Sequence, residues 1–105
     1  MASTGVARAL YREGMRHEPA YRVPLSVDRG PGHLYRFTNV GGEPLHGVTL
    51  TLHGSGIMGA NPPTRLDPGQ SLEVDIVGRA LARDSILVVR WFRPDGIEYL
   101  WRVSF

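Results

Sequence analysis

The chain of 105 residues contains no cysteine and no lysine, and both absences narrow its chemistry. Without cysteine there are no disulfides, zinc thiolates or thiol nucleophiles, which fits a reducing compartment. The twelve arginines and ten acidic residues are spread along the whole chain. A nucleic-acid-binding domain typically carries a denser basic stripe, so we expect no nucleic-acid partner. The arginine bias fits either a GC-rich genome or selection for forked, stacked contacts at an interface.

Long apolar segments are missing as well. No run approaches the roughly 20 apolar residues that span a bilayer, so we expect no membrane partner. The first residues, Met1 to Arg8, lack the basic and apolar regions of a signal peptide. These features lead us to expect a cytoplasmic protein. The length suits one domain, and a 42% hydrophobic fraction is typical of a globular chain.

Residues 1–19 differ in pattern from the rest of the chain. Ser3 or Thr4 is placed to cap a short helix, in which Val6 and Leu10 would share one face. A helix of about ten residues is marginal in water by itself. The sequence therefore predicts an N-terminal arm or short helix over residues 1–19, followed by a β domain over residues 20–105.

From Tyr21 onward, apolar and polar residues alternate with a period of two, which indicates β-strands. Pro24 lacks an N–H and places the first strand at a sheet edge. The turn sequence Arg93–Gly96 joins the last two strands into a hairpin. The strands are predicted at residues 21–27, 33–38, 48–53, 71–76, 86–92 and 99–105, with a short strand at 57–58 and one helical turn within 78–84. About six or seven short strands describe an antiparallel sandwich or a small barrel.

Two segments carry a resemblance to a known class. Phe37-Thr38-Asn39-Val40-Gly41, leading into the strand that ends at Leu52, resembles the second-to-third strand region of prokaryotic immunoglobulin-like domains of the CARDB and fibronectin-III type. Leu66-Asp67-Pro68-Gly69-Gln70-Ser71 resembles the entry into their fifth strand. The resemblance implies an all-β, two-layer, immunoglobulin-like sandwich of about seven strands. Such domains usually act as adhesive, spacer or protein-contact modules.

The alternation also predicts which side chains form the core. We expect Arg90 and Arg102 to face solvent. Because neighbouring residues of a strand point to opposite sides, Trp91 and Trp101 then point into the core. The predicted core comprises Leu50, Leu52, Leu72, Val74, Val89, Trp91, Trp101 and Val103.

The same parity leaves an unusual outer face on the last two strands. The strand 86–92 is apolar on both sides, whereas a sandwich strand needs only one buried side. The outward residues of the two strands are Ile86, Val88, Arg90, Phe92, Leu100 and Arg102. Either the N-terminal segment covers them, through Val6, Leu10 and Tyr11, or they form a contact face for another protein.

Local motifs for catalysis or cofactor binding are weak. Gly54–Gly59 matches G-x-G-x-x-G after a strand, but Pro62 and Pro63 oppose the helix that a dinucleotide site needs. His53 and Ser55 are neighbours without a nucleophile elbow. The four histidines, His17, His33, His46 and His53, show no ligand spacing. We therefore expect no enzyme activity, no cofactor and no metal.

Two functions follow from these patterns. The first is a protein-interaction or assembly module, with a protein partner or self-association through the outer face of the last two strands. The alternative is a sandwich that binds a small ligand or carbohydrate with the loops around Gly54–Pro63.

Overall fold

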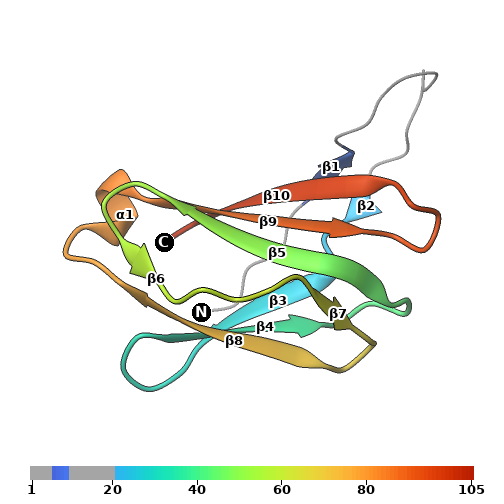
Figure 1. Cartoon of the computed structure of the whole chain (residues 1–105), viewed down its shortest axis with the longest axis horizontal. Coiled ribbons are helices and arrows are strands. Elements are labelled where there is room, and N and C mark those ends of the chain that lie inside the picture. The colour runs from blue at the N-terminus through green and yellow to red at the C-terminus, as the bar shows by residue number, and fades with distance from the viewer. Residues whose placement is uncertain (1–5, 10–20) are drawn as a thin grey trace.

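The computed structural model of the chain describes residues 6–9 and 21–105, and these form a two-layer antiparallel β-sandwich (Figure 1). One sheet has six strands, in the order β2 (Tyr21–Arg22), β1 (Val6–Ala9), β10 (Glu98–Ser104), β9 (Ile86–Phe92), β5 (Leu45–His53) and β7 (Thr64–Leu66). The other has four, in the order β3 (Leu25–Arg29), β4 (Leu34–Asn39), β8 (Ser71–Val77) and β6 (Ile57–Met58). A single helical turn, α1 (Leu81–Asp84), links β8 to β9, and the all-β prediction is confirmed.

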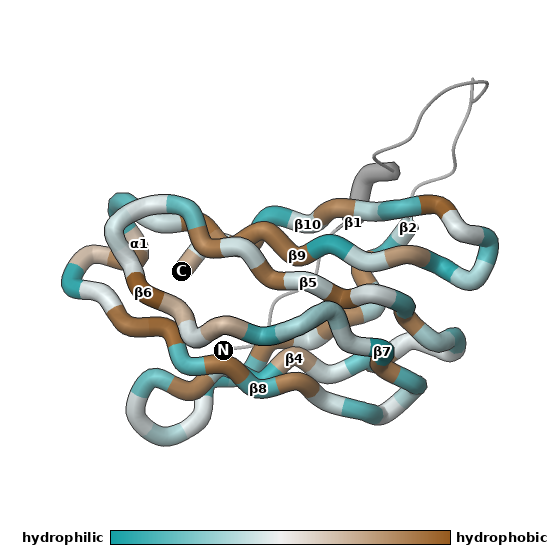
Figure 2. Tube along the Cα trace, in the orientation of Figure 1, coloured by the Kyte–Doolittle hydropathy of each residue, from teal (hydrophilic) through white to brown (hydrophobic). Residues whose placement is uncertain are grey.

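The core lies between the sheets and is filled by the inward side chains of both. Trp91 and Val89 from β9 and Phe37 from β4 are fully buried. Hydrophobic and hydrophilic residues alternate along most strands in Figure 2, as expected for strands with one buried face. Six of the eight predicted core residues are buried, and the other two, Leu52 and Leu72, pack against the core while partly exposed.

The β9–β10 hairpin forms as predicted. Its register runs from Ile86 opposite Ser104 to Phe92 opposite Glu98. In the turn, the Gly96 N–H donates to the Arg93 carbonyl at 2.8 Å, and Gly96 takes a positive φ of 85°. Glycine adopts that conformation without a Cβ clash, which explains its place in this turn.

The helix predicted at the N-terminus is wrong where the structure describes it. Val6–Ala9 forms strand β1, which lies between β2 and β10. Arg8 pairs with Leu100 on one side, and Val6 pairs with Arg22 on the other. Backbone hydrogen bonds to two strands outweigh the weak local preference of a short helix. The rest of the predicted helix, including Leu10, lies outside the described residues.

The first predicted strand is correct in position but is interrupted. Val23 and Pro24 separate β2 from β3, and the two halves belong to different sheets. Pro24 cannot donate to a ladder, and its carbonyl instead accepts the Val40 N–H at 2.8 Å. Both halves lie at sheet edges, as Pro24 predicted. A further short strand, β7, was not predicted, because the preceding Pro62 and Pro63 give its segment the pattern of a loop.

Candidate functional site

The predicted interface residues lie together on the outer face of the six-stranded sheet. Leu87, Val89 and Trp91 are buried in the core, so the alternate positions of β9 point away from it. On β10, Tyr99, Trp101 and Val103 are buried in the same way. We call the outward set of β9 and β10 the outer face; it comprises Ile86, Val88, Arg90, Phe92, Leu100 and Arg102.

The residues of the outer face differ in exposure. Phe92 is 39% exposed, and its ring packs beside Gly47, where a Cβ would lie 3.4 Å from the ring. Ile86 and Leu100 are half-buried, whereas Val88 is only 8% exposed. The accessible apolar surface therefore consists of Phe92 with parts of Ile86 and Leu100. Val88 points to the same side but is buried and adds little to that surface.

Charged side chains surround these apolar residues. Arg90 contacts Glu98 of the neighbouring strand at 3.3 Å, and both arginines of the face are exposed. Arg102 lies opposite Val88 in the register, and Arg90 lies opposite Leu100. Arginine interleaved with apolar side chains is the composition enriched in protein interfaces.

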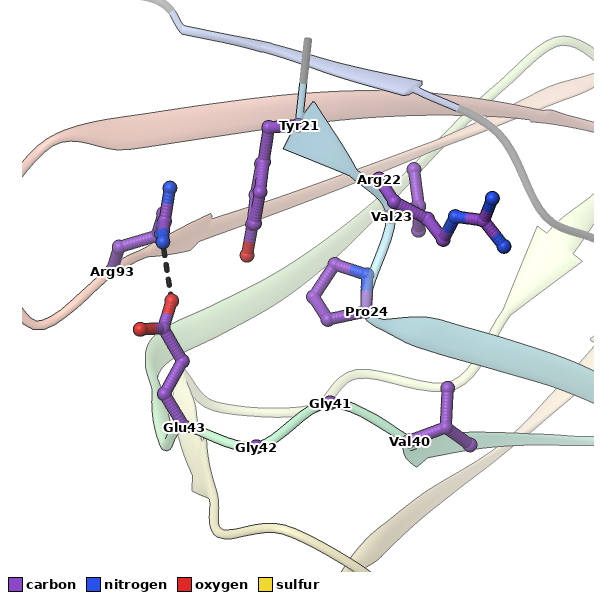
Figure 3. A pocket seen from close by; sticks show the side chains of 9 residues that line it. All are labelled: Tyr21, Arg22, Val23, Pro24, Val40, Gly41, Gly42, Glu43 and Arg93. Atoms are coloured by element: carbon purple, nitrogen blue, oxygen red, sulfur yellow. Dashed lines mark hydrogen bonds and ion pairs between the residues drawn. The ribbon is translucent and has the colours of Figure 1, made fainter. Parts of the chain in front are cut away.

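A separate feature, which sequence reasoning missed, is a pocket at the end of the sandwich where β9 turns into β10 (Figure 3). Its volume is about 430 Å³, and it is lined by residues 21–24, residues 40–43 and Arg93. That volume falls within the range typical of small-ligand sites. The lining comes from three separate segments that share no motif, so no local pattern indicates it.

The polar side chains of the pocket are mostly engaged with one another. Arg93 Nε donates to Glu43 Oε1 at 2.6 Å, and its guanidinium lies 4.1 Å from the centre of the Tyr21 ring. The Glu43 hydrogen bond is the main reason that the pKa of Arg93 lies above its usual value, so the guanidinium stays charged. Tyr21 is the one aromatic residue among the described residues of the lining, and the cation covers one face of its ring, so a stacking ligand has little of that ring to use.

Tyr21 is held at the boundary between pocket and core. Its ring lies 4.7 Å from that of Tyr99 and 6.4 Å from that of Trp91. Burial raises the pKa of the Tyr21 phenol, and the Trp91 indole N–H offsets part of that rise. Among the described residues, neither Tyr21 Oη nor Trp91 Nε1 makes a well-formed hydrogen bond. We therefore interpret the effect of the indole as a close electrostatic contact, and both polar groups as parts of the core.

Asn39 positions the loop that carries Glu43. This side chain is 1% exposed, and its Nδ2 donates to the carbonyls of Glu43 and Leu66, each at 2.9 Å. Its Oδ1 accepts the Gly41 N–H at 2.9 Å. A buried asparagine satisfied in this way fixes the loop to β7, and the pocket wall is rigid as a result.

The glycine-rich segment at Gly54–Gly59 lies at the opposite end of the sandwich, beside α1 (Figure 1). Ser55 Oγ donates to Asp84 Oδ2 at 2.5 Å, and no histidine bridges them. Hydrogen bonds from Ser55 and then Ser85 lower the pKa of the exposed Asp84 carboxyl. The serine is thus a donor to a carboxylate that stays ionised, which is the wrong arrangement for an activated nucleophile.

The glycines of this segment serve close packing. A Cβ on Gly54 would lie 2.1 Å from the Asp84 carbonyl oxygen, and one on Gly56 would lie 2.6 Å from Leu81 Cδ2. Backbone and side chains of α1 therefore occupy the space beside Gly54 and Gly56, which explains these two glycines without a phosphate, whereas a Cβ on Gly59 would meet nothing within 4 Å. Among residues 21–105, no three histidine, aspartate or glutamate side chains are grouped closely enough to hold a metal ion. His17 lies outside the described residues.

In the part of the chain that the structure describes, no helix has the length and apolar character needed to cross a membrane. Comparison of the chain with protein-family models, with curated proteins and with solved structures gives no match. Function must therefore be argued from the surfaces of this sandwich alone.

Proposed function

We propose that the domain is a non-catalytic protein-interaction or assembly module that uses the outer face of β9 and β10. The observation that carries the proposal is the double-sided apolar character of β9. Its inner side supplies Trp91 and Val89 to the core, and its outer side leaves Phe92 39% exposed. Complete burial of a side chain of this size contributes about 1.5–3 kcal/mol, and a partner gains the part of it that belongs to the exposed surface of Phe92.

The described backbone of the N-terminal segment lies beside this face, in the same sheet. Val6–Ala9 pairs edge to edge with β10, so its backbone lies in the plane of the sheet. Leu10 and Tyr11, which were also considered as a cover, lie outside the described part of the chain.

A photo-cross-linking amino acid placed at position 92 tests the proposal in the cells that make the protein. We expect a discrete protein adduct from position 92, and its loss in a Leu100→Glu background, because a charge beside the cross-linker disrupts an apolar contact. The matched control places the cross-linker at Arg79, an exposed position between β8 and α1, where no adduct is expected. Equal labelling from positions 79 and 92, or none from 92, would contradict the proposal.

The alternative is that the domain binds a small ligand. The pocket beside Arg93 suits this alternative better than the Gly54–Pro63 loops do, because the loop glycines pack against α1. Its volume favours this alternative, whereas the mutual engagement of Arg93 with Glu43 and Tyr21 weakens it. Chemical shifts of Val40, which is 60% exposed in the pocket lining, would report such a ligand.

Two further assignments belong to the proposal. Membership of the immunoglobulin-like class is supported by the two packed antiparallel sheets. A cytoplasmic location is supported by the absence of cysteine from the sequence.

A further inference from the structure

The four-stranded sheet also has an outer face, on the opposite side of the sandwich, and it is acidic. Its outward positions follow from the buried alternation of Leu25 and Val27 on β3 and of Val74 and Ile76 on β8. The charged residues at these positions are Asp28, Arg36, Glu73 and Asp75. Arg36 and Glu73 offset each other through an ion pair of 2.6 Å. Among the described residues, Asp75 and Asp28 form no ion pair, although Asp28 lies opposite Arg36 in the register.

Apolar side chains accompany this acidic charge. Ile57 on β6 is 74% exposed, and its register partner on β8, Val77, is 44% exposed. Asp75 lies two residues before Val77 on the same strand face, opposite the half-buried Leu34. We call this set, with Asp28, the acidic face. Contiguous exposed apolar residues rimmed by polar ones are a feature of contact sites, and this pair is the apolar part of the acidic face.

The outer face of β9 and β10 has the opposite charge. Its strands carry two outward guanidinium groups, Arg90 and Arg102, against one carboxylate, Glu98, which already contacts Arg90. The two sides of one molecule thus present apolar residues with complementary charge. Two copies of the same cationic face would instead bring arginines together, which disfavours a symmetric face-to-face dimer.

We infer that the partner of the outer face is a second copy of this chain, which docks through its acidic face. This inference rests on the proposed function and names the partner. Arg102 and Arg90 approach Asp75 and Asp28, while Phe92 meets the Ile57–Val77 pair. The contact is head-to-tail, so a pair of copies retains one free outer face and one free acidic face, and association continues into a ring or filament.

Two exposed charge reversals separate the faces cleanly. Arg102→Glu disrupts the outer face only, and Asp75→Arg disrupts the acidic face only. Both side chains are exposed, so thermal melting should confirm intact folds. By sedimentation equilibrium, the parent should form species larger than a dimer as concentration rises, and each variant should associate at least about tenfold more weakly.

The decisive sample is an equimolar mixture of the two variants. Each variant retains the face that the other has lost, and the two altered faces carry opposite charges after the reversals. The mixture should therefore associate more strongly than either variant alone. The double variant has both charges reversed and should recover association. Arg79→Glu, the control in the loop after β8, should behave as the parent does.

Three outcomes would overturn the inference. They are a parent that stays monomeric at every concentration, an Asp75→Arg variant that associates as the parent does, and a mixture that associates no more strongly than either variant alone. Failure of the proposed function is recognised separately. An adduct from position 92 to a different protein, with a monomeric parent, would retain the contact face and reject the second copy as its partner.

Discussion

At the scale of single residues, the fold depends on glycines that no other residue can replace. Gly54 has a φ of 116°, and a Cβ there would lie 2.1 Å from the Asp84 carbonyl and 2.8 Å from Ser85 Cα. Both obstacles are backbone atoms, which cannot rotate away. The first two glycines of the G-x-G-x-x-G pattern are thus explained by the approach of α1 to the end of β5.

We expect Gly54→Ala to lower the free energy of unfolding by about 2–4 kcal/mol, through backbone strain and overpacking. Gly59→Ala is the matched control, because a Cβ there meets nothing within 4 Å. Its effect should stay within about 0.5 kcal/mol. Urea denaturation of both variants checks the prediction, and equal losses of stability would show that the contact with α1 is not a constraint.

At the scale of elements, Asn39 links β4 to two neighbouring segments through three hydrogen bonds. Asn39→Ala removes the side-chain donor from the Leu66 carbonyl, where the hydrogen bond is buried, and from the Glu43 carbonyl, where it is part-buried. We expect a loss of about 2–4 kcal/mol, because each unmet buried polar group costs about 1–3 kcal/mol. Thr38→Ala is the control, since its hydroxyl bonds Ser71 at the exposed surface. A similar small loss for both variants in thermal unfolding would refute the role of Asn39.

The strands that the sequence predicts are those whose alternation is visible locally. β5, β8, β9 and β10 each carry several apolar residues at every second position, so their inward faces follow without a structure. β1 and β7 are different, because they have four and three residues and depend on the strands that flank them. The interruption at Pro24 likewise reflects the change of sheet, which no local pattern encodes.

Of the two candidate sites, the sequence predicts the outer face but not the pocket. The outer face follows from parity alone, because fixing Trp91 in the core places Arg90 and Phe92 outside. The pocket does not, since Arg93 meets Tyr21 and Glu43 only after three distant segments converge. The burial of Val88 could not be predicted from the alternation either, because alternation gives the direction of a side chain and not its exposure.

At the scale of the whole molecule, the central feature is a sandwich with two contact-competent sides of unlike charge. Ion pairs within each side leave Arg102 on one and Asp28 with Asp75 on the other. Ion pairs between exposed side chains of two copies are weak and are screened by salt. Self-association should therefore weaken as ionic strength rises. The apolar contact of Phe92 with Ile57 and Val77 supplies the part of the association free energy that salt does not weaken.

The most direct test is a methyl NMR spectrum recorded while the protein concentration is raised. The signals of Ile86 and Leu100 on the outer face, and of Ile57 and Val77 on the acidic face, should shift or broaden together. Those of the buried Leu25 and Leu45 should stay unchanged. A spectrum in which none of the four surface residues responds to concentration, or in which only Val40 beside the pocket does, would contradict the account.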